Sequence, residues 1–442
     1  MTIFYSYTIA IALIIGLSIW TGVRGQRDSL HPALVLGAMA LFLYVLMPLK
    51  IAAEDGFFGY LTERQLVFGQ LVNLVGIAAL VLGVAIGAYG GTFREGFVRL
   101  LPEGPRVYNA AIIVGLAGVW GYGAGILAMG GFSRAYGVAY GGGWSDSGYV
   151  RELYLMTSPA ILLLLASGRV VGSIQSWTWV ALFGAPLAIQ GLLGARRGPT
   201  FVVLVTILAG VYLIRGRRPL LLQVLGGGAA VGVLLLLLVA NRQNIYIGSE
   251  FRLEGDPTEV LSAGSGNEFI YGAGSVYTAS ETGQYYWGGR YATVLFIRPI
   301  PRSIWPEKYE FAKKTFGADV EVNMGVDIDA MTHIMGWVGA FGAATGIVAD
   351  MFIEFSWGMV AVMFGLGYFY GRSWRNSVTK GGIWIVVYGV ALALSIYLIM
   401  QSLEAFLFRV LFMLAPVGWV WWYAGLGRFE NAEPEGGARS PA

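Results

Sequence analysis

Cysteine is absent from the 442-residue sequence, and charged residues are scarce. Without a thiol, the chain has no disulfide framework, no thiolate metal site and no cysteine nucleophile. Charged residues make up 12% of the chain and apolar residues 56%, whereas soluble domains contain about 25% and 45–50%. This composition leaves too little polar surface for a soluble enzyme. The 65 glycines show no three-residue period, which excludes a collagen-like chain.

Long apolar runs occupy most of the sequence. A helix of about 20 apolar residues crosses a bilayer core, and a helix satisfies its own backbone polar groups there. The runs predict about eleven spanning helices, near residues 4–22, 31–49, 67–90, 107–128, 152–168, 175–194, 198–214, 219–240, 353–371, 382–400 and 404–424. We therefore expect an all-α, polytopic membrane protein. The first run lacks a charged n-region and a cleavage site, so we expect a retained span.

These runs divide the chain into four parts. Residues 1–240 hold about eight N-terminal spans, 241–352 form a long polar segment, 353–427 hold about three C-terminal spans, and 428–442 form a tail. The tail is rich in Pro, Gly and Glu, so we expect it to be disordered. Residues 335–349 are short for a full span, and a span there would turn the Arg215–Arg218 cluster outward, so we expect a re-entrant or interfacial element.

The Lys and Arg residues of the short connections indicate an orientation. Alternate connections carry most of them: Arg24, Arg27, Arg94, Arg99, Arg106, Arg169, Arg215, Arg217, Arg218, Arg372, Arg375, Lys380, Arg428 and Arg439. Cytoplasmic loops of membrane proteins are enriched in these residues. We therefore expect the C-terminus in the cytoplasm, and the N-terminus and segment 241–352 on the outer face.

Segment 241–352 is rich in aromatic residues, among them Tyr271, Trp287 and Trp305. Aromatic rings of this kind stack on sugar faces, and they also pack at the membrane interface. The stretch Arg298-Pro299-Ile300-Pro301-Arg302-Ser303-Ile304-Trp305-Pro306-Glu307-Lys308 contains three prolines, which predict an extended, stiff strut. Held on such a strut, Arg298 and Arg302 suit a diphosphate or an anionic lipid head. The alternative is a structural turn whose arginines pair with nearby acids.

Two further arginines lie in a short turn between apolar runs, in Gly194-Ala195-Arg196-Arg197-Gly198-Pro199-Thr200. Arginine is costly inside a bilayer, so Arg196 and Arg197 indicate either an anion clamp at the outer boundary or interfacial side chains that snorkel.

His333, Asp350 and Glu354 are the candidate proton-transfer residues. Histidine exchanges a proton near neutral pH, and His333 stands near the end of the outer segment. Carboxylates at a membrane boundary mark functional sites by default, although Asp350 or Glu354 is equally suited to pairing with an arginine. Neither a metal motif nor a nucleotide-binding glycine motif stands out, so we expect no metal and no cofactor.

Together these patterns resemble the O-antigen polymerases of the Wzy type, also called oligosaccharide repeat unit polymerases. The Arg196–Arg197 turn is similar to the family's glycine–arginine turn between spans. The proline-rich stretch is similar to an Arg-x-x-Pro-x-x-x-Trp-Pro-x-Lys stretch of its outer loop. Residues 346–358 (GIVADMFIEFSWG) are similar to the family's Gly-Glu-x-Tyr-x-Asn-Phe-Gly entry to the next span, with Asp350 and Glu354 in place of Glu and Asn.

The resemblance implies a metal-independent glycosyltransferase with a GT-C-like fold in the bacterial inner membrane. Such an enzyme polymerises undecaprenyl-diphosphate-linked repeat units on the periplasmic face for O-antigen, capsule or exopolysaccharide. The lipid-linked oligosaccharide is donor and acceptor, membrane lipids and a chain-length regulator are candidate partners, and no nucleic acid is expected. We hypothesise that Arg196, Arg197, Arg298 and Arg302 stabilise the diphosphate and that His333, Asp350 or Glu354 is the base.

Three other functions remain open from the sequence. An O-antigen ligase shares topology and chemistry and differs in its acceptor. A transporter of polysaccharide or lipid-linked sugar usually shows inverted repeats and midplane charges, and no repeat is apparent. A non-catalytic assembly scaffold is the third.

Overall fold

The computed structural model describes residues 1–426 except 55, 97–100, 102–103, 140–147, 169–172, 251, 301, 303, 318–324 and 341–342. These residues form helices and connecting turns, with no β-strand among them. The expected tail from Arg428 lies outside them, as do Arg99 and Arg169. The N-terminal half contains α1 (Thr2–Trp20), α2 (Pro32–Leu41), α3 (Met47–Ala53), α4 (Glu63–Ala88), α5 (Gly104–Ala128), α6 (Phe132–Tyr136), the 3-10 helix η4 (Gly148–Met156), α7 (Thr157–Ala166), α8 (Ile174–Leu192), α9 (Arg197–Arg215) and α10 (Leu221–Ala240).

The rest of the chain holds short helices followed by three long ones. They are α11 (Glu268–Thr282), α12 (Gly289–Ala292), the π-helical η6 (Thr293–Ile297), α13 (Lys308–Phe316), α14 (Ile328–Met335), α15 (Ile347–Phe355), α16 (Met359–Thr379), α17 (Ile383–Met400) and α18 (Leu403–Tyr423).

Nine helical segments among the described residues are long and apolar enough to cross a membrane. They confirm a polytopic helical membrane protein and match nine of the predicted runs. The predicted run 152–168 is a shorter apolar helix, Glu152–Ala166, and the run 175–194 corresponds to α8. The eleven-span count therefore stays a prediction. The ninth predicted span begins earlier than expected, because α15 and α16 together form one candidate span, Ile347–Thr379.

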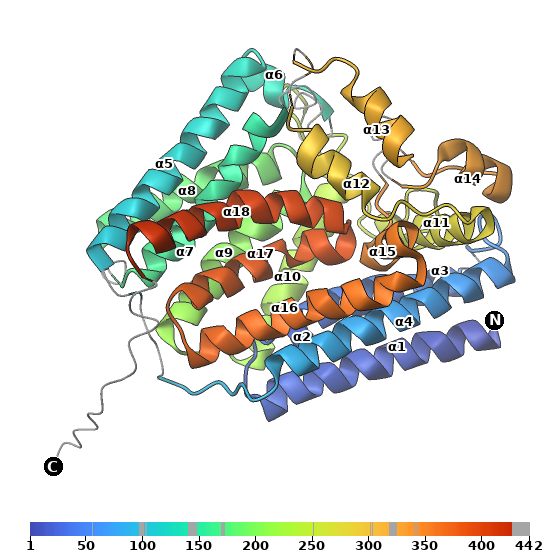
Figure 1. Cartoon of the computed structure of the whole chain (residues 1–442), viewed down its shortest axis with the longest axis horizontal. Coiled ribbons are helices and arrows are strands. Elements are labelled where there is room, and N and C mark those ends of the chain that lie inside the picture. The colour runs from blue at the N-terminus through green and yellow to red at the C-terminus, as the bar shows by residue number, and fades with distance from the viewer. Residues whose placement is uncertain are drawn as a thin grey trace.

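Helices α4 and α16 form the closest-packed pair in the bundle. They run side by side in the same direction, with α1 beside α4 (Figure 1). A Cβ atom on Gly83 would lie 2.1 Å from the Phe364 carbonyl oxygen, and one on Gly367 would lie 2.0 Å from that of Leu80. Small residues of this kind let helix backbones approach closely in a membrane.

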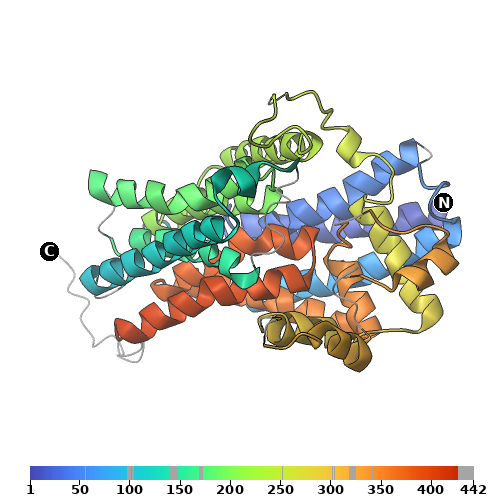
Figure 2. The ribbon, with the colours of Figure 1, turned by 90° about the horizontal axis from the view of Figure 1, so that it is seen from above.

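The short helices α11–α14 gather at one end of the bundle, beside the start of α1 (Figure 1). Helix α11 packs against its neighbours through buried side chains, among them Phe269, Ile270 and Tyr271. The view from above shows the long helices running toward the other end (Figure 2). Segment 241–352 is thus largely folded, and residues 336–340 and 343–346 are not helical, in agreement with the expectation that no full span lies at 335–349.

A cluster of polar residues around Asp28 holds together the end of the bundle that lies away from α11–α14. The Asp28 carboxylate accepts hydrogen bonds from Arg218 at 2.7 and 3.0 Å, from the Trp374 indole at 2.7 Å and from the Leu30 amide at 2.8 Å. These partners come from the connections before α2 and α10 and from α16. One buried carboxylate therefore joins three parts of the chain, and charge-assisted hydrogen bonds of this type are the strong ones.

Candidate functional site

The predicted carboxylates Asp350 and Glu354 surround one buried arginine. They lie four residues apart on α15 and so share a face of that helix. Arg290 of α12 is only 2% exposed, forms an ion pair with Asp350, and places its Nε 2.8 Å from Glu354 Oε2. The amide of Arg290 also lies 3.3 Å from Glu354 Oε1. Both carboxylates therefore act first as partners of Arg290.

Other donors complete the shell around Asp350. The Tyr291 hydroxyl donates to Asp350 Oδ2 at 2.8 Å, and the Leu403 amide donates to the same oxygen at 2.9 Å. The second of these bonds anchors the first turn of α18 on the α15 carboxylate. The Trp287 amide donates to the Glu354 carbonyl at 2.7 Å, so the chain leading into α12 is fixed as well.

The electrostatics of Arg290 follow from these contacts. Burial opposes its charge, but Asp350, Tyr291 and Glu354 hold the pKa of Arg290 well above its ordinary value. Burial, with the Asp350 carboxylate beside it, also raises the pKa of Tyr291 well above its ordinary value. Arg290 is therefore a fixed cation, and Tyr291 is a neutral hydrogen-bond donor.

Glu404, Arg298 and Arg409 form a looser group beside this cluster. Glu404 is the second residue of α18, its side chain is 8% exposed, and Arg298 Nη1 lies 3.9 Å from its Oε1. Arg409 donates to the Ala405 carbonyl at 2.6 Å and lies over the rings of Tyr397 and Phe408, 3.7 and 4.2 Å from their centroids. Arg409 forms no ion pair with the described carboxylates.

The remaining predicted arginines go to different partners. Arg197, at the start of α9, pairs with Glu268 of α11, with 2.5 Å between Nη2 and Oε1. Arg196 directly precedes α9. Its positive charge lies close enough to act on Tyr136 of α6, a helix outside the candidate spans. Arg302 lies over the Tyr309 ring, 5.1 Å from its centroid. Arg197 and Arg298 therefore pair with carboxylates of two different helices, α11 and α18.

The proline-rich stretch is not the extended strut that its sequence predicts. Its described residues form turns. The chain folds back so that the ammonium of the buried Lys308 donates to the carbonyls of Arg298, at 2.9 Å, and Ile300. Pro301 and Ser303 lie outside the described residues. The buried lysine still gives the stretch a defined shape and places Arg298 near Glu404.

The predicted sugar-stacking residues and His333 are dispersed. Tyr271 is buried in α11, Trp287 is 68% exposed, and Trp305 packs against Phe311 with ring centroids 5.1 Å apart. His333 is exposed on α14, which lies away from α5 in Figure 1. No common sugar platform joins these side chains.

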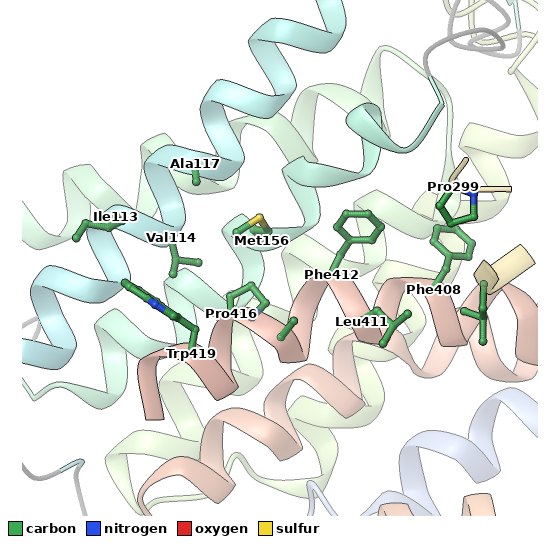
Figure 3. Close-up of a pocket in the computed structure, with 12 residues that line it drawn as sticks. Ile113, Val114, Ala117, Met156, Pro299, Phe408, Leu411, Phe412, Pro416 and Trp419 are labelled. Atoms are coloured by element: carbon green, nitrogen blue, oxygen red, sulfur yellow. The ribbon is translucent and has the colours of Figure 1, made fainter. Parts of the chain in front are cut away.

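An apolar groove of about 620 Å³ lies between α5 and α18 (Figure 3). It is lined by Ile113, Val114, Ala117, Met156, Leu295, Pro299, Phe408, Leu411, Phe412, Ala415, Pro416 and Trp419. Trp419 stands at one end, and Phe408 and Pro299 stand at the other. Charged residues are the chain neighbours of the lining at the second end: Arg298 precedes Pro299 and Arg409 follows Phe408, and both act electrostatically on Glu404.

Sequence reasoning missed three of these features: Arg290, Glu404 and the groove. The only signal for Arg290 was its position in the aromatic- and glycine-rich stretch 285–291 (YYWGGRY). Glu404 was a carboxylate at a predicted span boundary, which is the signal that selected Asp350 and Glu354.

Comparison of the chain with protein-family models, with curated proteins and with solved structures gives no match.

Proposed function

We propose that this protein is a membrane glycosyltransferase that polymerises undecaprenyl-diphosphate-linked oligosaccharide repeat units. The observation that carries the proposal is the apolar groove between α5 and α18, one end of which is lined by Pro299 and Phe408, the chain neighbours of Arg298 and Arg409. A polyprenyl diphosphate is a long apolar chain with an anionic head. The apolar groove would hold the chain, and the arginines near its end would bind the head.

The groove suits a prenyl chain in lining and position. Its side chains are aliphatic, aromatic or methionine, and two of its walls, α5 and α18, are candidate membrane spans. Each buried CH₂ group contributes about 0.8 kcal/mol of transfer free energy. Part of a long prenyl chain in the groove would therefore hold the lipid while its head remains at the polar end.

The cations at the head of the groove suit the chemistry of the leaving group. Negative charge develops on the diphosphate as the bond to the sugar breaks, and preorganised donors stabilise that charge at little reorganisation cost. Arg298 and Arg409 are the cations nearest this end in the chain, and the Lys308 ammonium fixes the backbone that carries Arg298. We assign diphosphate binding to these two, and Arg197 to the structural pair with Glu268.

We place the reaction on the periplasmic face of a bacterial inner membrane, with the N-terminus on the same side. The support is that the short helices α11–α14 gather at the end of the bundle where α1 begins, away from the arginine-rich connections around Asp28. A ligase would use the same donor site with another acceptor, so the product distinguishes the two functions.

The test is deletion of the gene in its host, followed by gel analysis of surface glycans. Single-repeat glycans are expected, because the donor is made and attached but not polymerised. Long glycan that is not attached to its acceptor would indicate a ligase, and intracellular lipid-linked units would indicate a transporter. Unchanged glycans would contradict the proposal.

Complementation with an altered groove tests the carrying observation. Ala415→Phe fills the groove from α18 and is expected to leave single-repeat glycans, since the prenyl chain has no room. The matched control is Ala361→Phe, at an exposed position of α16 outside the groove, which is expected to restore full-length chains. Equal chain lengths in both variants, at equal protein levels, would show that the groove does not hold the donor.

A further inference from the structure

We infer that Glu404 is the group that takes the proton from the acceptor hydroxyl in the proposed transfer reaction. This inference rests on the proposed function and adds the identity of its proton acceptor. It is carried by a difference in charge pairing among the three buried carboxylates at this end of the bundle, since Asp350 and Glu354 pair closely with Arg290 and Glu404 does not.

Asp350 and Glu354 are already committed to other groups. Asp350 accepts from Arg290, from the Tyr291 hydroxyl and from the Leu403 amide. Glu354 forms an ion pair with Arg290 at 2.8 Å through Oε2, and its Oε1 accepts from the Arg290 amide at 3.3 Å. Protonation of either carboxylate would remove a charge partner of the buried Arg290, so neither is suited to take the proton of a substrate.

Glu404 lacks such close partners among the described residues. Its contact with Arg298 is loose, at 3.9 Å, although its side chain is only 8% exposed. The backbone around it is held on both sides, because the Leu403 amide binds Asp350 and Ser402 caps α18 through a 3.1 Å bond from the Ala405 amide. The carboxylate is therefore carried on a fixed backbone and keeps lone pairs that can accept a proton, which is what a general base requires.

The position of Glu404 along α18 connects it with the groove. Residues 404, 408, 411, 412 and 415 recur at helical spacing and so lie on one face of α18. Phe408, Leu411, Phe412 and Ala415 line the groove, and Glu404 stands one turn beyond Phe408 at its charged end. The donor sugar at the head of a lipid in the groove, and the acceptor hydroxyl that attacks it, would meet near this carboxylate.

The charges that act on Glu404 come from several elements near the start of α18. They are Arg290 of α12, Asp350 of α15, Arg298 after η6 and Arg409 of α18. Two of these, Arg298 and Arg409, are the cations assigned to the leaving diphosphate. The proton acceptor and the site of the departing negative charge are thus adjacent.

The step balances with these groups alone. The acceptor hydroxyl oxygen attacks the anomeric carbon of the donor sugar and forms the new glycosidic bond. The bond between that carbon and the diphosphate oxygen breaks, and its electron pair leaves with the diphosphate. The hydroxyl proton passes to the Glu404 carboxylate and then to solvent.

The experiment uses the full-length protein in lipid nanodiscs, with lipid-linked repeat units extracted from the deletion strain as substrate and undecaprenyl diphosphate as the binding probe. We expect Glu404→Gln to lower turnover by about 10²-fold or more, the usual contribution of a general base. Probe binding should stay within about threefold of wild type. Glu404→Asp should retain part of the turnover, and Glu310→Gln, at an exposed position of α13, should match wild type.

Two readouts separate proton transfer from a structural role. The wild-type rate should fall at low pH as Glu404 is protonated, and the residual rate of Glu404→Gln should lose this acid limb. Arg298→Gln should instead weaken probe binding, so the two halves of the 3.9 Å pair should not share a phenotype.

Each outcome decides between the two proposals. Full turnover by Glu404→Gln, or an unchanged acid limb, overturns the role of Glu404 and leaves the proposed function intact. A wild-type protein that neither binds the probe nor elongates the substrate overturns the proposed function, and this inference with it.

Discussion

His31 is a buried side chain beside the Asp28 cluster, and its protonation can lower the stability of the folded protein. It caps α2 by accepting a hydrogen bond from the Ala33 amide at 3.2 Å, and its ring meets the Trp374 ring edge-on with centroids 4.4 Å apart. Its Nε2 is buried without a hydrogen-bond partner. Burial lowers the pKa of His31 from 6.5 to about 4, and the Asp28 carboxylate offsets this only partly.

This shift predicts a pH-dependent stability. The unfolded chain binds the His31 proton below pH 6.5, whereas the folded chain binds it only near pH 4. Stability should therefore be complete above pH 6.5 and fall toward pH 4, by about 3 kcal/mol at most. Thermal unfolding in detergent across this range measures the effect. His31→Asn keeps a capping side chain and should flatten the slope, and an equally steep slope would exclude His31 as its source.

At the residue scale, the sequence predicted types of residue better than partners. Asp350 and Glu354 lie near the start of a candidate span, and their partner Arg290 lies 60 residues from Asp350 in the chain. Arg197, which was expected to bind diphosphate, pairs with Glu268, and its role in diphosphate binding stays a prediction. Local patterns do not show which of many arginines meets a given acid, because tertiary packing decides it. The role of His333 stays a prediction, at an exposed position.

At the element scale, the packing of α16 on α4 makes a sharp prediction. Gly367 faces the Leu80 carbonyl, 2.0 Å from where its Cβ would lie, whereas Gly365 on the same helix has no atom within 4 Å of that position. Gly367→Val should separate the two helices and cost about 1–3 kcal/mol or more, as overpacking does. Gly365→Val is the matched control, with the same change in side chain. Equal thermal stabilities for the two variants would contradict the close approach.

Hydropathy predicted the long helices because membrane spans must be apolar and of fixed length. It failed where that constraint is weak. The start of the ninth span was expected at residue 353, but α15 begins at Ile347 and carries Asp350 and Glu354 in its buried face. The turn structure of the proline-rich stretch depends on Lys308, whose carbonyl partners are eight and ten residues away. A pattern limited to neighbouring residues contains no such contact.

At the scale of the whole molecule, the charged clusters lie at opposite ends of the bundle. Arg290, Asp350 and Glu404 lie at the end that carries α11–α14, and Asp28 with Arg218 lies at the other. The alternation of positive connections in the sequence predicted such a division, since it tracks which loops remain in the cytoplasm. The order of the helices in space, and with it the α5–α18 groove, was not predictable, because apolar faces in lipid carry little information on their neighbours.

The absence of cysteine makes the orientation directly measurable. Asp329, exposed on α14, and Lys380, exposed after α16, lie at the two ends of the bundle. Asp329→Cys should react with a membrane-impermeant maleimide in cells whose outer membrane has been permeabilised, because the positive-inside bias places α14 outside. Lys380→Cys should react only after the inner membrane is opened. The reverse result would place Glu404 and the head of the groove in the cytoplasm, where a reaction on exported lipid-linked sugars could not occur.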